Sequence, residues 1–264
     1  MRKIIDVTLI NTELHLLDLR INILQDVVDE FYVVQATKTF SGLPKKTFSH
    51  NDYSHPKLHY VTIEFPEGLG TWDRDHYQRN YKVLDITGYK RDPEMSLKLS
   101  DDDIVLISDL DEVPNPEKLL ELKKTFNPDL TYSFTQIMHQ YYLNNQNISE
   151  PWAGSKACSV ERYTSDNLIP QQLRDSSGHQ LIENGGWHWS FLGDEEFLKN
   201  KIESYAHQEH NNRFTKDSII YRKDDNKDIF DRGFTLQTVK LDSTYPTYIL
   251  ENQDKLKQYI KEVE

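Results

Sequence analysis

The sequence predicts an α/β fold with a mixed central sheet flanked by helices. Strand, helix and strand patterns follow one another within about thirty residues near the start of the chain, which is the order of a parallel βαβ unit. Short β-branched runs recur between polar loops farther along, as expected for buried strands. Beyond Asn127 this alternation gives way to short strands separated by polar turns, which indicates a mixed rather than an all-parallel sheet.

The first half of the chain alternates strands with helices. Ile4–Ile10 is a nearly continuous apolar run typical of a buried strand, and Glu13–Leu24 repeats leucine and isoleucine at helical spacing. Further strands are expected at Phe31–Val34, Leu58–Ile63 and Ile104–Ile107, and further helices at Asp73–Ile86 and Pro116–Phe126.

The second half is less regular. Strands are expected at Thr131–Phe134, Gln140–Leu143 and Trp187–Phe191, and helices at Asp194–His207 and Asn252–Val263. The polar stretch Tyr163–Asn184 is expected to form a long loop. Because the chain contains no repeat and no clean linker, we expect a single domain over residues 1–264.

Charge and cysteine content limit the partners and the compartment. The 264 residues include 43 acidic and 31 basic side chains, a net charge of -12, which argues against nucleic acid or an anionic membrane as partner. The one cysteine, Cys158, excludes an internal disulfide and fits a reducing compartment. Neither a signal-peptide core after Met1 nor an apolar run of membrane-spanning length is present, so we expect a cytoplasmic protein without a membrane span.

Two aspartates directly follow the strand pattern Ile104–Ile107. In an extended segment residues i and i+2 point the same way, so Asp109 and Asp111 could face one hard divalent cation together with phosphate oxygens. A solvated turn or a helix cap is the alternative, because aspartate favours both. The buried strand before the pair and Pro114 after it favour a Mn²⁺ or Mg²⁺ site at the carboxyl end of a strand.

The segment Gly185–Ser190 combines glycine, tryptophan and histidine. Alternation places His188 and Ser190 on one face and Trp187 and Trp189 on the other. A histidine between tryptophans is either packed in the core or a metal ligand, and as a ligand His188 would complete the site begun by the two aspartates. The two glycines predict a strand that passes close beneath a ligand.

Candidate proton acceptors follow. Glu196 lies at a helix start, where the helix dipole favours an acidic residue, but it could also deprotonate an attacking hydroxyl. Glu209 is the second candidate for this base. His207 and His210 lack the spacing of a zinc protease motif, so we expect them to contact an acceptor or to support the metal ligands.

Two cations lie near the expected ligand edge. Lys38 follows the second strand, Arg79 lies on the helix after a glycine-rich loop, and either could contact diphosphate oxygens or lie on a solvated face. The sequence contains no glycine-rich phosphate fingerprint, so it gives no support for ATP or NAD.

Six blocks, in the same order between about residues 4 and 235, resemble glycosyltransferase family 17. They are Ile5-Asp6-Val7, Val27-Val28-Asp29, Thr37–Gly42, Gln78-Arg79-Asn80, Ser108–Pro114 and Gly186–Ser190. An ordered set of this kind is more specific than any of its members.

The resemblance implies a GT-A type, Rossmann-like nucleotide-sugar-binding fold, with residues 1–126 binding the donor and 127–264 facing the acceptor. It also implies a metal-dependent, inverting transfer of a sugar, by default GlcNAc from UDP-GlcNAc, to a hydroxyl of a glycan acceptor. Asp109 and Asp111 match the family's D-x-D aspartates, which are expected to hold Mn²⁺ against the UDP diphosphate.

Two other functions are compatible with these residues. A metal-dependent hydrolase of nucleotide sugars would use the same aspartates to position water. A noncatalytic glycan-binding module would instead stack its tryptophans on sugar rings. The tryptophans are Trp72, Trp152, Trp187 and Trp189.

Overall fold

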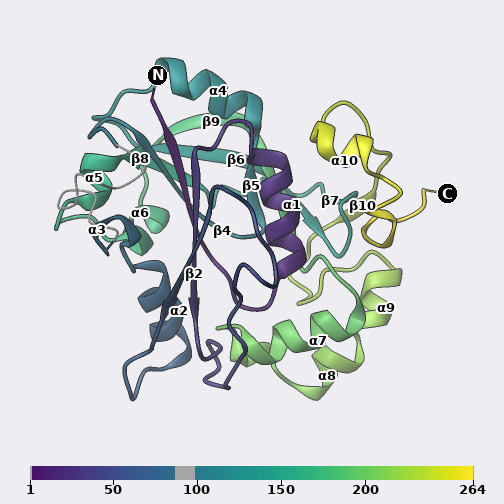
Figure 1. Cartoon of the computed structure of the whole chain (residues 1–264). Helices are drawn as coiled ribbons and strands as arrows, with labels where there is room; N and C mark the ends of the chain where they lie inside the picture. The colour runs from purple at the N-terminus through teal and green to yellow at the C-terminus, as the bar shows by residue number, and fades with distance from the viewer. Residues whose placement is uncertain (1, 87–98, 264) are drawn as a thin grey trace.

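The computed structural model describes residues 2–86 and 99–263, and places one mixed sheet between helices (Figure 1). The strands run in the order β10-β7-β6-β8-β4-β1-β2-β3, and β9 joins the sheet beside β6 and carries β5 on its other side. The strands are β1 (Ile4–Leu9), β2 (Glu30–Ala36), β3 (Leu58–Ile63), β4 (Ile104–Asp109), β5 (Glu112–Pro114), β6 (Tyr132–Gln140), β7 (Asn145–Asn147), β8 (Lys156–Ser159), β9 (Gln180–Ser190) and β10 (Leu236–Thr238). The helices are α1 (Leu14–Leu24), α2 (Thr71–Arg79), α3 (Val83–Ile86), α4 (Pro116–Thr125), α5 (Val160–Thr164), α6 (Pro170–Asp175), α7 (Glu195–Ser204), α8 (Arg213–Asp217), α9 (Ile219–Asp224) and α10 (Thr247–Glu251), with 3-10 turns at Gln208–His210 and Lys257–Tyr259.

Strand direction changes in the middle of the sheet. β4, β1, β2 and β3 are parallel, whereas β8 is antiparallel to both β4 and β6. The predicted α/β class with a mixed sheet is therefore confirmed, and the four parallel strands coincide with those predicted from the first half of the sequence.

The parallel strands are buried on both faces, which explains their continuous apolar runs. Ile4, for example, packs toward α1 and α4, whereas its neighbour Ile5 packs on the opposite face with residues of α3, α5 and α6. A further apolar cluster joins α7 and α9 to the end of β9 through Phe191, Leu198 and Ile219. This cluster fixes α7 and α9 beside the carboxyl ends of the central strands (Figure 1).

Three predicted elements are wrong. The expected helix Asp73–Ile86 is divided into α2 and α3 by a break over residues 80–82. The expected strand Gln140–Leu143 is a turn, because β6 ends at Gln140 and Tyr141 has a φ of 68°, in the left-handed region. The expected helix Asn252–Val263 contains only the 3-10 turn Lys257–Tyr259.

The expected loop Tyr163–Asn184 is also wrong. It contains α6, which begins with Pro170 in the first turn where a missing N–H costs nothing, and the first residues of β9. The short strands β5, β7, β8 and β10 were not predicted, because three or four residues are too few to show a hydrophobic period.

Candidate active site

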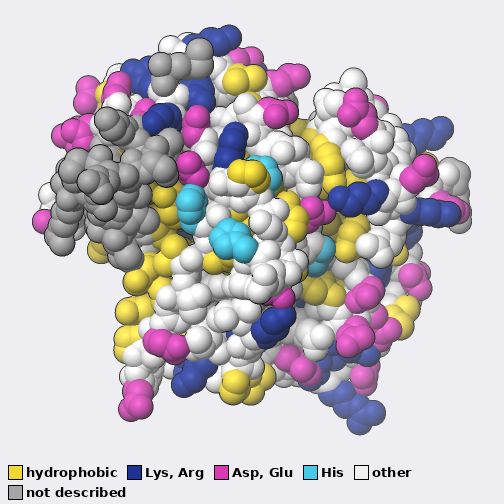
Figure 2. Space-filling view, viewed as in Figure 1, with side chains coloured by type: hydrophobic (Ala, Val, Ile, Leu, Met, Phe, Trp, Pro, Cys, Tyr) yellow, Lys and Arg dark blue, Asp and Glu magenta, His cyan; other side chains and the backbone are white. Residues whose placement is uncertain are grey.

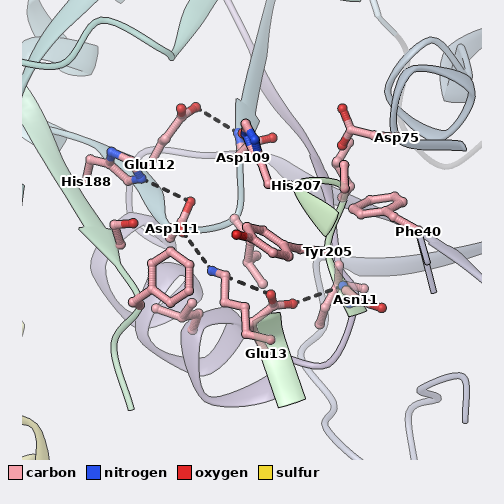
Figure 3. A pocket seen from close by; sticks show the side chains of 18 of the residues that line it. Asn11, Glu13, Phe40, Asp75, Asp109, Asp111, Glu112, His188, Tyr205 and His207 are labelled. Atoms are coloured by element: carbon pink, nitrogen blue, oxygen red, sulfur yellow. Dashed lines mark hydrogen bonds and ion pairs between the residues drawn. The ribbon is translucent and has the colours of Figure 1, made fainter. Parts of the chain in front are cut away.

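A cavity of about 260 Å³ opens at the carboxyl ends of β1 and β4 (Figure 3). Figure 2 shows histidine side chains near the middle of one face of the molecule, with hydrophobic side chains beside them. The cavity is lined by side chains from both halves of the chain. The charged, histidine and aromatic ones are Glu13, Phe40, Trp72, Asp75, Arg79, Asp109, Asp111, Glu112, Trp152, His188, Phe191, Lys201, Tyr205, His207, Phe230 and Arg232.

Strand pairing brings the two aspartates to this cavity. β4 runs parallel to β1 with Asp109 opposite Leu9, so Asp109 lies where both strands end. The chain then turns through Leu110 and Asp111 into β5, and the backbone carbonyl of Asp111 accepts a hydrogen bond of 2.8 Å from the N–H of Trp189.

The buried side chain of Arg20 supports the turn that carries the two aspartates. Arg20 of α1 is fully buried and forms a two-pronged ion pair with Asp6, with both N–O distances at 2.7 Å. Its remaining N–H groups donate to Oγ of Ser108 and to the carbonyls of Asp109 and Glu112, the last at 2.6 Å. The turn that carries the aspartates is thus anchored to the core by one guanidinium group.

Asp109 is engaged by two other arginines. Its Oδ1 accepts from Arg79, which also pairs with Asp75, and its Oδ2 accepts from Arg174 at 3.0 Å. The pKa of Arg79 is raised: burial opposes its charge, but Asp109 and Asp75 outweigh that cost. The structure therefore brings Arg79 to Asp109, as an ion-pair partner.

Asp111 faces Lys201 and His188. Nζ of Lys201 lies 3.2 Å from its Oδ2, and Nε2 of His188 lies 3.5 Å from its Oδ1 (Figure 3). Burial would raise the pKa of Asp111, yet the charges of these two neighbours hold that pKa well below its usual value. Asp111 is therefore ionised at neutral pH.

Glu112 is a buried carboxylate beside the aspartates that was not predicted as a site residue. Arg174 donates to it at 2.6 Å, and the indole N–H of Trp152 donates to its Oε1 at 2.6 Å. Its carboxylate needs the space left by Gly154, because a Cβ there would lie 1.9 Å from Oε1. Burial would raise the pKa of Glu112, but Arg174 lowers it to about 2.

Acid should therefore destabilise the fold through Glu112. A carboxylate whose folded pKa is depressed stabilises the fold above its ordinary pKa of 4.5, and this contribution is lost as the pH falls toward about 2. The variant Glu112→Gln should be less stable than the wild type at pH 7, but should lose less stability between pH 4.5 and pH 2. Urea unfolding across this range measures both, and parallel pH profiles would contradict the assignment.

His188 reaches the site from β9. This strand pairs with β5 so that His188 lies opposite Glu112, and the alternation predicted for this strand is confirmed: Trp187 and Trp189 stack in the core while His188 faces the cavity. The proposed sugar-stacking role is wrong for these two tryptophans, which are 4% and 0% exposed.

The explanation for the glycines in this strand is also wrong. A Cβ on Gly186, whose φ is 137°, would lie 2.1 Å from the carbonyl of Val113. Glycine is therefore required by the close approach of β5, not by a ligand.

Three predicted site residues lie outside this cavity. Lys38 is exposed, and its backbone pairs with that of Pro44. Glu196 is exposed and lines a separate cavity with Lys45. Glu209 does not line the main cavity either, but its carboxylate contacts His207, which does.

Several residues at the site have no sequence signal that would reveal them. Arg174 falls in the segment expected to be a loop, and Lys201 is one of two lysines on α7. Glu13 looked like a helix start, but its carboxylate accepts from the N–H groups of Asn11 and Thr12 and lies 3.7 Å from Lys201. Only the tertiary fold places these charges together.

Comparison with known sequences defines the class of protein as a glycosyltransferase. The profile of glycosyltransferase family 17 matches residues 1–257, and the chain belongs to this family. The chain is similar to the human and rat proteins named beta-1,4-mannosyl-glycoprotein 4-beta-N-acetylglucosaminyltransferase, at 25% identity over 237 residues in each case. It is 33% identical over 234 residues to the mouse protein of the same name.

These alignments cover 75% of this chain and 42% of each relative, so the chain spans less than half of the length of the relatives it matches. Among the helices in residues 2–86 and 99–263, none has the length and apolarity needed to cross a bilayer.

Proposed function

We propose that this glycosyltransferase transfers GlcNAc from UDP-GlcNAc to a hydroxyl of a glycan, with a divalent cation at the site and on a GT-A type scaffold. The observation that carries the proposal is the position of Asp109, Asp111 and His188 around one cavity at the carboxyl ends of β1 and β4. Ligands of open α/β sheets bind at this edge. The cytoplasmic location stays a prediction.

The donor set suits a Mn²⁺ or Mg²⁺ ion. Asp111 and His188 offer an oxygen and a nitrogen 3.5 Å apart, and Nδ1 of His188 is buried without a hydrogen-bond partner in the described part of the chain. The three predicted ligands are Asp109, Asp111 and His188. Among the described residues, their ligand atoms do not all lie within 4.8 Å of one another. Such ions are commonly held by one or two carboxylates and completed by phosphate oxygens and water. When bound, the ion would neutralise charge on the departing diphosphate.

The remaining cations of the cavity fit an anionic donor. Lys201 lies beside Asp111, and Arg232 lines the same cavity while Asp228 holds its guanidinium group at 2.6 Å. Arg79, Lys201 and Arg232 all line the cavity and each is paired with a carboxylate, so these three cations are the candidates for contacts to the diphosphate.

Inversion follows from the bond that the relatives' name describes. That name specifies a β-linked product, and UDP-GlcNAc carries an α-linked sugar, so a single displacement at C1 accounts for the change. A general base on the acceptor side is then needed.

Donor and metal can be tested together by thermal shift. UDP-GlcNAc at about 100 times its Kd with Mn²⁺ should raise the Tm by roughly 5–10 °C, because it binds only the folded state. GDP-mannose with Mn²⁺ is the matched control and should shift the Tm far less. Mass spectrometry should then detect a GlcNAc product on p-nitrophenyl β-mannoside.

No shift with UDP-GlcNAc and Mn²⁺ would reject this donor. Steady release of free GlcNAc that no acceptor accelerates would instead favour the nucleotide-sugar hydrolase. Sugar binding that survives chelation and the loss of both aspartates would favour the glycan-binding module, with Trp72 and Trp152 as its exposed tryptophans.

A further inference from the structure

His207 and Glu209 form a hydrogen-bonded pair at the cavity. Nδ1 of His207 lies 2.6 Å from Oε1 of Glu209, and His207 is among the side chains that line the cavity (Figure 3). An ionised carboxylate only accepts hydrogen bonds, so Nδ1 carries the proton and Nε2 of the neutral ring is left free to accept one.

The environment fixes the ring but leaves Nε2 accessible. Trp72 of α2 contacts the imidazole edge to face at 4.4 Å, Tyr205 lies 5.5 Å away and His210 lies 6.0 Å away, each between ring centroids. In the described part of the chain Nε2 has no hydrogen-bond partner, and His207 is exposed to the cavity. Burial would raise the pKa of Glu209, but the hydrogen bond from His207 contributes to a net lowering of it.

The carboxylates that line the cavity already have partners. Each already has a cation or hydrogen-bond donors as partners within the described residues, so its oxygens are occupied and less available to an incoming hydroxyl. The pairs are Glu13 with the N–H groups of Asn11 and Thr12, Asp75 with Arg79, Asp109 with Arg79 and Arg174, Asp111 with Lys201, and Glu112 with Arg174 and Trp152.

We propose that His207 is the general base that activates the acceptor hydroxyl, and that Glu209 is its positioning residue, an inference that rests on the proposed transferase function. Trp72 beside it is 42% exposed and offers a flat surface on which an acceptor sugar can stack. A hydroxyl of that sugar would then lie next to Nε2. This assignment moves the base from Glu196 and Glu209 to the imidazole between Trp72 and Glu209.

The step balances as a single displacement. The acceptor oxygen bonds to C1 of the donor sugar while its O–H proton moves to Nε2 of His207. The C1–O bond to the diphosphate breaks, and its electron pair leaves with UDP. Glu209 stabilises the resulting imidazolium, which then releases its proton to water.

His207→Ala tests the base. Release of UDP from UDP-GlcNAc with Mn²⁺ is measured with p-nitrophenyl β-mannoside and with water as acceptors. We expect kcat to fall by about 10²–10⁴-fold with little change in the KM for the donor, and added imidazole to restore part of it. The Tm shift caused by UDP and Mn²⁺ should stay as in the wild type. His50→Ala, on an exposed loop, is the matched control and should keep full activity.

Glu209→Gln tests the positioning role. The amide oxygen still accepts from Nδ1 but carries no charge, so kcat should fall by about 10-fold, and Glu209→Ala should lose more. Retention of kcat within twofold in His207→Ala would overturn the proposal. Loss of the Mn²⁺-dependent UDP shift in that variant would overturn it too, since His207 would then be a metal ligand. A wild-type protein with neither shift nor turnover would instead overturn the proposed function itself.

Discussion

Asp111→Asn is expected to abolish most glycosyl transfer, lowering kcat/KM by roughly 10³-fold, because a Lewis-acid cation at the leaving group contributes several kcal/mol. The substitution keeps the size of the side chain but removes the negative charge that faces His188 and Lys201. The Mn²⁺-dependent part of the Tm shift caused by UDP should disappear as well. Steady-state kinetics and thermal shift on the same preparation measure both.

Asp217→Asn provides the matched control. Asp217 is exposed on α8 and pairs only with Arg213 one turn away, among the described residues, so its loss should change neither turnover nor the Tm shift. If Asp111→Asn kept both its turnover and its dependence on Mn²⁺, a metal at this carboxylate would be excluded. The Tm of Asp111→Asn without ligand shows whether this variant is folded. In it Lys201 keeps Glu13, at 3.7 Å, as a second partner.

The parallel half of the sheet was predictable because its strands are buried on both faces. Continuous apolar runs such as those around Ile5 and Val105 arise from that burial, and the helices between them have room for a full period. The second half is built from short strands such as β7 and β8, whose sequences Asn145–Asn147 and Lys156–Ser159 are held by partners from distant parts of the chain. The local sequence pattern of a short strand does not indicate which distant segment the strand pairs with.

The residues of the site also divide into those that the sequence pattern locates and those that it does not. The positions of Asp109, Asp111 and His188 at the cavity were predictable because each follows or lies within a recognisable strand, whose end or face sets the position of the side chain. The cations that surround them were not, because Arg174 and Lys201 come from helices with no motif. Glu196 shows the limit of such reasoning: a helix start near the site in sequence opens onto a different cavity.

The largest effect on stability is expected at Arg20. Arg20→Met leaves Asp6 as an unpaired charge that is 1% exposed, and breaking a buried pair in this way costs about 3–5 kcal/mol of the free energy of unfolding. The variant also removes the donors to the carbonyls of Asp109 and Glu112, so turnover should fall even where the protein is folded. Urea unfolding at pH 7 measures the first effect, and kinetics at low temperature the second.

A double substitution separates lost charge pairing from lost anchoring of the turn. Asp6→Asn in the Arg20→Met background removes the stranded charge and should recover part of the stability. It should recover none of the activity, because the carbonyls of the turn still lack their donor. Arg213→Met, whose side chain is 93% exposed, is the control and should cost less than about 1 kcal/mol. A double variant with restored turnover would show that Arg20 serves the fold alone and does not position the aspartates.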